Sequence, residues 1–95
     1  MNEARPQAAL QIHSGDNVAV AFANLTAGAT ITGPFGAVVL HSPAGAKQKV
    51  ALVDFAAGDP VTMYGVLVGR ATRPIARGEA LSTNNVRHDA SSVRL

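Results

Sequence analysis

The chain contains no cysteine and no tryptophan, and the missing cysteine excludes whole classes of chemistry. Disulfides, thiolate metal sites and thiol redox centres cannot form, and this composition fits a reducing cytosol. Aromatic side chains are also few, namely Phe22, Phe35, Phe55 and Tyr64. The core must therefore consist mainly of valine, leucine, isoleucine and alanine, which favours strands over a helical bundle.

Long apolar runs and basic runs are absent as well. No segment approaches the roughly 20 apolar residues that span a bilayer, and the first ten residues carry an early acid and no apolar signal core. We therefore expect a soluble, cytoplasmic protein with no membrane partner. The net charge is only +2, with no Lys/Arg run and no aromatics interleaved with basic residues, so nucleic acid is not an expected partner.

The positive charge lies largely in arginines of the second half of the chain. These arginines are Arg70, Arg73, Arg77, Arg87 and Arg94. Two interpretations stay open: they attract an anionic substrate or partner, or they form a solvated face that keeps the protein soluble.

What the chain does contain is a recurring pattern, apolar-x-x-Gly-x-x-apolar. It occurs at residues 25–31, 55–61 and 75–81, so that Gly28, Gly58 and Gly78 occupy equivalent positions. A central glycine supplies a positive-φ residue at little steric cost, which predicts similar tight corners at three strand ends. Chance matches in an Ala- and Gly-rich sequence are the alternative, and three copies argue against it.

A chain of 95 residues is expected to form one domain with a modest core that depends on a partner. Alternating apolar residues and turn signals predict short strands at 9–13, 17–23, 37–41, 49–54, 61–64, 66–71 and 80–83. A short helix capped by Asp16 and Asn17 is an alternative for the second of these, but Val18, Val20 and Phe22 alternate as in a strand.

The predicted fold class is therefore mostly β, with short strands, tight glycine turns and at most short helical turns. Tyr64-Gly65 predicts a hairpin turn. Residues 1–86 are expected to form the domain, and residues 87–95 lose periodicity and resemble a linker-like tail. Exposed edge strands in so small a β domain favour self-association or pairing with a partner.

Four ordered blocks carry a family resemblance. They are Ile-His-x-x-Asp-Asn-Val-Ala-Val-Ala (12–21), Lys-Val-Ala-Leu-x-Asp (49–54), Tyr-Gly-x-x-x-Gly-x-Ala (64–71) and Ile-Ala-x-Gly-Glu (75–79). Together they resemble the N-terminal domain of altronate and galactarate dehydratases, a SAF domain. The resemblance implies a β-clip fold and hydro-lyase chemistry, in which a base removes a proton α to a carboxylate and a β-leaving group departs.

In that family the catalytic machinery belongs mainly to a large portion, within the same polypeptide or in a separate subunit as in sulfolactate sulfo-lyase. The resemblance therefore implies a small accessory subunit or N-terminal domain, inactive alone, that shapes or closes a hydroxy-carboxylate site on a large dehydratase-type partner. We expect no cofactor in this chain and place any divalent metal in the partner. The alternatives are a free-standing SAF-type module that binds a sugar acid without catalysis and a degenerate copy without a site.

The chain departs from the family pattern at several histidines. The family's Gly-His-Lys corresponds to Lys47, Gln48 and Lys49, and the family's Gly-Glu-His-Val-His-x-His-Asn carries Ala80, Ser82 and Asn84 at its histidine positions. The amides of Gln48 and Asn84 hydrogen-bond but do not carry protons as an imidazole does, and Ser82 is no acid or base unaided. No pair of histidines in the sequence has the helix or loop spacing that suits metal ligation. We therefore expect neither a metal site nor a catalytic residue in this chain.

Nine residues remain as candidates for substrate binding. They are Lys49, Gln48, Ser82, Asn84, Asn85, His13, Asp16, Asn17 and Arg70. Lys49 is either a fixed cation for a carboxylate or an exposed strand lysine, and Asn84 and Asn85 are candidate hydroxyl-recognising amides. Asp16 and Asn17 either join a polar site or bond the backbone of their own turn.

The other polar residues are less defined. Arg70 faces either solvent or an incoming acid. His41 and His88 have no matching partners in the sequence and are expected at the surface.

Overall fold

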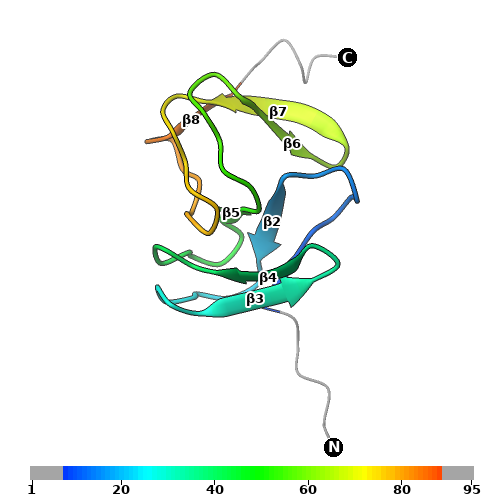
Figure 1. The fold of residues 1–95 in the computed structure, drawn as a ribbon, viewed down its shortest axis with the longest axis vertical. Coiled ribbons are helices and arrows are strands. Elements are labelled where there is room, and N and C mark those ends of the chain that lie inside the picture. The colour runs from blue at the N-terminus through cyan, green and yellow to red at the C-terminus, as the bar shows by residue number, and fades with distance from the viewer. Residues whose placement is uncertain (1–7, 89–95) are drawn as a thin grey trace, which may run out of the picture.

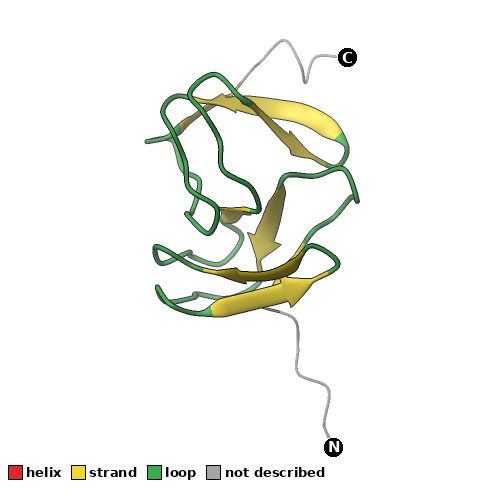
Figure 2. Ribbon diagram, viewed as in Figure 1, coloured by secondary structure: helices red, strands yellow, loops and turns green. Residues whose placement is uncertain are grey.

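The computed structural model describes residues 8–88, a range that contains short strands and turns and no helix (Figure 2). The strands are β1 (Ala9–Leu10), β2 (Val18–Ala21), β3 (Thr30–Gly33), β4 (Gly36–Val39), β5 (Lys49–Ala51), β6 (Pro60–Met63), β7 (Val66–Ala71) and β8 (Val86–His88). The mostly β prediction is confirmed. In this part of the chain no helix exists that could cross a membrane.

The strands form three small antiparallel sheets, ordered β1-β2-β5, β3-β4 and β6-β7-β8. The β3–β4 and β6–β7 hairpins lie at opposite ends of the molecule, with β2 between them (Figure 1). Each end has its own core. The core at the β3–β4 end includes Ile31, Val38, Leu40 and Leu52, and that at the β6–β7 end includes Val18, Phe55, Val61, Ile75 and Leu81.

The corner predicted three times occurs four times among residues 8–88. It spans 26–29, 45–48, 56–59 and 76–79, and in each copy the fourth N–H donates to the first carbonyl at 2.9–3.1 Å. The third residue has positive φ, as a type II turn requires: Gly28 (89°), Lys47 (72°), Gly58 (89°) and Gly78 (94°). The sequence pattern missed the second copy because a lysine stands where the other three have glycine.

The residues that directly precede the four turns pair in two sets. The backbones of Leu25 and Ala44 exchange two hydrogen bonds just before the first two turns, and those of Phe55 and Ile75 do so before the last two. The first pair flanks the β3–β4 hairpin and the second pair flanks the β6–β7 hairpin. The fold therefore repeats the order turn, hairpin and turn twice. The strand β5 lies between the two repeats and contributes to both cores.

One strand prediction is wrong, and the strand β3 was not predicted. The strand expected at 80–83 is wrong, because Ala80 makes only an isolated bridge to Val50 and a turn follows, with Asn85 N donating to Ser82 O at 3.1 Å. The strand β3 was missed, since Ile31 is its only buried apolar side chain and gives little periodic signal.

The end of the described fold also differs from expectation. The linker-like tail was predicted to start at Arg87, but Arg87 and His88 lie in β8, which pairs with β7. Residues 89–95 lie outside the described range, so the domain boundary itself stays a prediction.

Candidate functional site

A pocket of about 150 Å³ lies between the start of β5, the β6-β7-β8 sheet and the loop after the fourth turn. Its lining residues are Lys49, Val61, Val68, Leu81, Ser82, Thr83, Val86 and His88. Two of the predicted substrate-binding residues, Lys49 and Ser82, therefore come together here. Both are half-buried, whereas Thr83 and His88 are exposed. The other lining residues are apolar.

Backbone pairing explains why Lys49 and Ser82 meet. Lys49 begins β5 and pairs with Val20 of β2, while its carbonyl accepts a hydrogen bond from Leu81 N at 2.8 Å. Ser82 follows Leu81 directly, so this bond carries its hydroxyl to the side of Lys49. Ser82 Oγ accepts from Asn84 N at 3.1 Å, which leaves the hydroxyl hydrogen available for a ligand.

Thr83 and His88 line the pocket although neither was among the predicted substrate-binding residues. His88 was expected at the surface, and it is indeed exposed, but β8 directs it along one wall of the pocket. Side chains at i and i+2 of a strand share a face, so Val86 and His88 lie on the same side of β8. An alternation of Val86, Arg87 and His88 was the available signal, and it is too short to distinguish a strand from a tail.

Gln48, another predicted binding residue, has both amide atoms engaged by the backbone. Its Oε1 accepts from Gly45 N and its Nε2 donates to Leu81 O, both at 2.9 Å. Asp59 and Glu79, at the same position in the third and fourth turns, likewise accept from the first N–H of their turns. Gln48 thus caps the second turn and ties it to the loop that carries Ser82.

We expect Gln48→Ala to lower the free energy of unfolding by about 1–3 kcal/mol, because two hydrogen bonds in a partly buried position are lost together. The measurement is urea denaturation of the full chain. The matched control is Asn84→Ala, since the Asn84 side chain is exposed and only its backbone N–H donates within the loop. Equal stability of the two variants would contradict the capping role.

Asn85 and Asn84 occupy different environments. Asn85 is only 3% exposed; its Oδ1 accepts from Ser82 N at 2.8 Å and its Nδ2 donates to Ala80 O at 3.1 Å. Asn85 therefore holds the loop that shapes the pocket, while Asn84 lies exposed on that loop.

The predicted cluster of His13, Asp16 and Asn17 lies elsewhere, against the β6–β7 hairpin. Asp16 is 5% exposed and accepts three backbone hydrogen bonds, from His13, Tyr64 and Gly65, at 2.9–3.1 Å. Asn17 bonds the backbone of β6 through both amide atoms. The structural interpretation of Asp16 and Asn17 is the one that the geometry supports.

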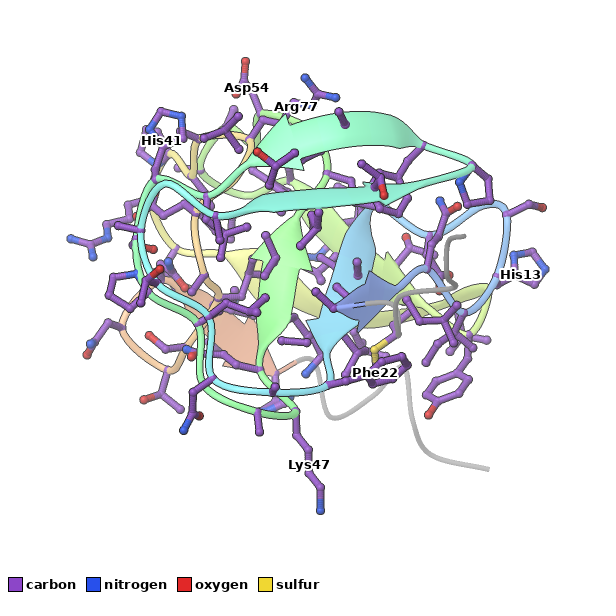
Figure 3. The ribbon with its side chains drawn as sticks, turned by 90° about the horizontal axis from the view of Figure 1, so that it is seen from below. His13, Phe22, His41, Lys47, Asp54 and Arg77 are labelled. Carbon is purple, nitrogen blue, oxygen red and sulfur yellow. The ribbon has the colours of Figure 1, made fainter. Side chains whose placement is uncertain are left out.

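The remaining predicted residues also lie outside the pocket lining. His13 projects at the periphery of the molecule (Figure 3), with its Nδ1 accepting from Gly15 N at 2.9 Å. Arg70 is exposed on β7 and donates to Gly58 O at 3.2 Å. Neither residue is among those that surround Lys49.

The arrangement around Lys49 matches a small hydroxylated anion. An ammonium group attracts a carboxylate, and the Ser82 and Thr83 hydroxyls and the His88 imidazole can hydrogen-bond to hydroxyl groups. Apolar walls with a few convergent polar groups are typical of ligand pockets. Within residues 8–88, no three histidine, aspartate or glutamate side chains group as metal ligands would.

Comparison with known proteins gives two findings. The family model of the altronate/galactarate dehydratase SAF domain matches residues 7–89. Altronate dehydratase of Escherichia coli (strain K12) is 36% identical over 84 residues, which cover 88% of this chain and 17% of that protein. The chain thus spans less than a fifth of the length of this relative.

Proposed function

This chain belongs to the SAF domain family of altronate and galactarate dehydratases, and from that premise we propose that it is the small accessory subunit or N-terminal domain of a sugar-acid dehydratase or a related sulfo-lyase. Its role is to shape or close a hydroxy-carboxylate site on a large catalytic partner. The observation that carries the proposal is the pocket that gathers Lys49, Ser82, Thr83 and His88. The relative is much longer than this chain, which supports a large partner.

The pocket suits a shared site because its polar groups differ in depth. Lys49 and Ser82 are half-buried and their backbone carbonyls accept hydrogen bonds from the loop and from β8, while Thr83 and His88 are exposed on the rim. Lys49 would hold the carboxylate of the substrate, and the rim would meet the catalytic partner. Proton abstraction and departure of the β-leaving group belong to the partner, together with any divalent metal. A cytoplasmic location fits the cysteine-free composition.

The second candidate is a free-standing module that binds a sugar acid without catalysis. The replacement of family histidines by Ala80, Ser82 and Asn84 favours it, because hydroxyl and amide groups recognise a ligand but do not transfer protons unaided. Calorimetric titration of the isolated chain with altronate and galactarate separates the two. Tight binding without a partner supports the module, whereas binding or turnover only with a large subunit supports the accessory role.

The test of the accessory role is a dehydratase assay of the complex purified with tagged chain, with Lys49→Met in place of the wild type. We expect at least about a tenfold loss of kcat/KM, as when one charge-assisted contact to a carboxylate is removed. The control is Lys47→Met, because Lys47 is exposed, lies two residues away and is not in the pocket lining. A complex that turns over equally fast without this chain, or with Lys49→Met, would refute the proposal.

A further inference from the structure

A second hollow, of about 350 Å³, lies between β4 and the fourth turn, away from the Lys49 pocket. It is lined by Ala37, Val38, Val39, His41, Asp54, Ala76 and Arg77. None of these residues lines the Lys49 pocket. His41, Asp54 and Arg77 gather at one edge of the molecule, with Lys47 at the opposite edge (Figure 3).

The guanidinium of Arg77, an exposed residue, is anchored at this hollow by two hydrogen bonds to backbone carbonyls. Its Nε donates to Leu52 O and its Nη2 donates to Ala37 O, both at 3.2 Å. In the part of the chain that the structure describes, its Nη1 has no hydrogen-bond partner and the guanidinium forms no ion pair. A guanidinium fixed in this way presents its remaining N–H groups to a carboxylate in a set orientation.

Asp54 presents the opposite charge beside it. Its Oδ1 accepts from the backbone N–H of Arg77 at 2.8 Å, while Oδ2 accepts no hydrogen bond from any residue between 8 and 88. An ionised carboxylate oxygen is an acceptor only. Asp54 is exposed, and a ligand group that contacts Oδ2 has to be a donor such as a hydroxyl or an ammonium group.

The other residues of the hollow are apolar, except His41, which packs against Gly78. Val39, 55% exposed, stands beside Ala37 and Ala76. The backbone N–H of His41 donates to Gly78 O at 2.9 Å, and its ring packs so closely on Gly78 that an added Cβ would lie 3.0 Å from Cδ2. The hollow thus combines an apolar wall with a guanidinium and a carboxylate that form no ion pair with each other.

We propose that this hollow is a binding site for a small carboxylate that also carries a hydroxyl or ammonium group. The carboxylate binds Arg77 Nη1, the donor group binds Asp54 Oδ2, and the carbon chain lies against Val39. This hollow is separate from the Lys49 pocket that carries the proposed function, and ligand binding here requires no partner. Failure of one proposal therefore leaves the other unaffected.

The experiment is a two-dimensional ¹H–¹⁵N NMR titration of the full chain with malate, aspartate and succinate. These share one carbon frame and differ in carrying a hydroxyl, an ammonium or neither. We expect malate or aspartate to shift the amides of residues 37–41, 54 and 76–78, and to bind at least about tenfold more tightly than succinate. Shifts confined to Lys49, Ser82 and His88, or none in the hollow, would overturn the proposal.

Two variants make the test specific. Arg77→Gln is expected to abolish the shifts, whereas Arg73→Gln, an exposed arginine outside the hollow, leaves them unchanged. Because Arg77 also supports the fold, Asp54→Asn provides a second test: its amide oxygen still accepts from Arg77 N, but its amide nitrogen cannot accept from a ligand. This variant should bind all three acids alike, and a retained preference over succinate would refute the assignment.

Discussion

Replacing Gly78 with alanine is expected to lower the free energy of unfolding by about 2–5 kcal/mol, the sum of a strained backbone conformation and an overpacked contact. Gly78 has a φ of 94°, which a residue with a Cβ adopts only at a cost. An added Cβ would also lie 2.2 Å from the carbonyl oxygen of Val39. That atom belongs to the backbone of β4, so it cannot move aside without displacing the strand.

The other turns provide a matched control for this effect. Gly28 and Gly58 each have a φ of 89°, and an added Cβ would meet nothing within 4 Å at either position. Gly28→Ala and Gly58→Ala should therefore cost only the conformational strain, about 1–2 kcal/mol. Urea denaturation of the three variants measures both terms, and a Gly78→Ala variant no less stable than the controls would contradict the close approach of the fourth turn to β4.

We expect Asp16→Ala to lower the free energy of unfolding by about 3–4 kcal/mol, because a buried carboxylate that accepts three backbone hydrogen bonds is removed. Two of these bonds come from Tyr64 and Gly65 at the tip of the β6–β7 hairpin. Tyr64 has a φ of 58°, unusual for a bulky residue. Asp16 thus stabilises a turn whose backbone is otherwise unfavourable.

Amide hydrogen exchange separates this local role from a general loss of stability. In Asp16→Ala, exchange at Tyr64 and Gly65 should accelerate more than exchange in β2 or β5. The control is Asp59→Ala, since the Asp59 side chain accepts a single exposed hydrogen bond, from Ala56 N, and its loss should cost about 1 kcal/mol, the usual net value of one hydrogen bond. Uniform acceleration across the chain, or equal costs for the two variants, would contradict the pinning of the hairpin by Asp16.

The elements that were predicted correctly depend on neighbours in the sequence. The Tyr64-Gly65 turn is present, with both residues at positive φ, as a two-residue hairpin loop requires. β7 has the predicted bounds, and Gly28, Gly58 and Gly78 all lie at the predicted corners. In each case a glycine or an apolar alternation signals the conformation locally.

The residues that were missed or reassigned depend on contacts between distant segments. Lys47 has a glycine-like positive φ in the second turn, which follows the Leu25–Ala44 bridge, and no local signal marks a lysine for that position. Gln48 carries the type of side chain that could bind a substrate, yet its amide reaches Leu81, 33 residues away. His88 lines the pocket because β8 pairs with β7, and Thr83 does so because the bond between Leu81 N and Lys49 O holds its loop beside β5.

Residue types and their spacing were enough to predict the mostly β class, three of the four corners and the family, and they marked Lys49 and Ser82 as candidates. Only the folded chain shows which polar side chains bond the backbone and which line a pocket. Two aspartates differ in this respect: Asp16 accepts hydrogen bonds from three backbone N–H groups, whereas Asp54 accepts one through Oδ1 and none through Oδ2 from residues 8–88. A buried polar group needs a hydrogen-bond partner, and two of the three partners of Asp16 are backbone atoms from a distant part of the sequence that come close to it only in the folded chain.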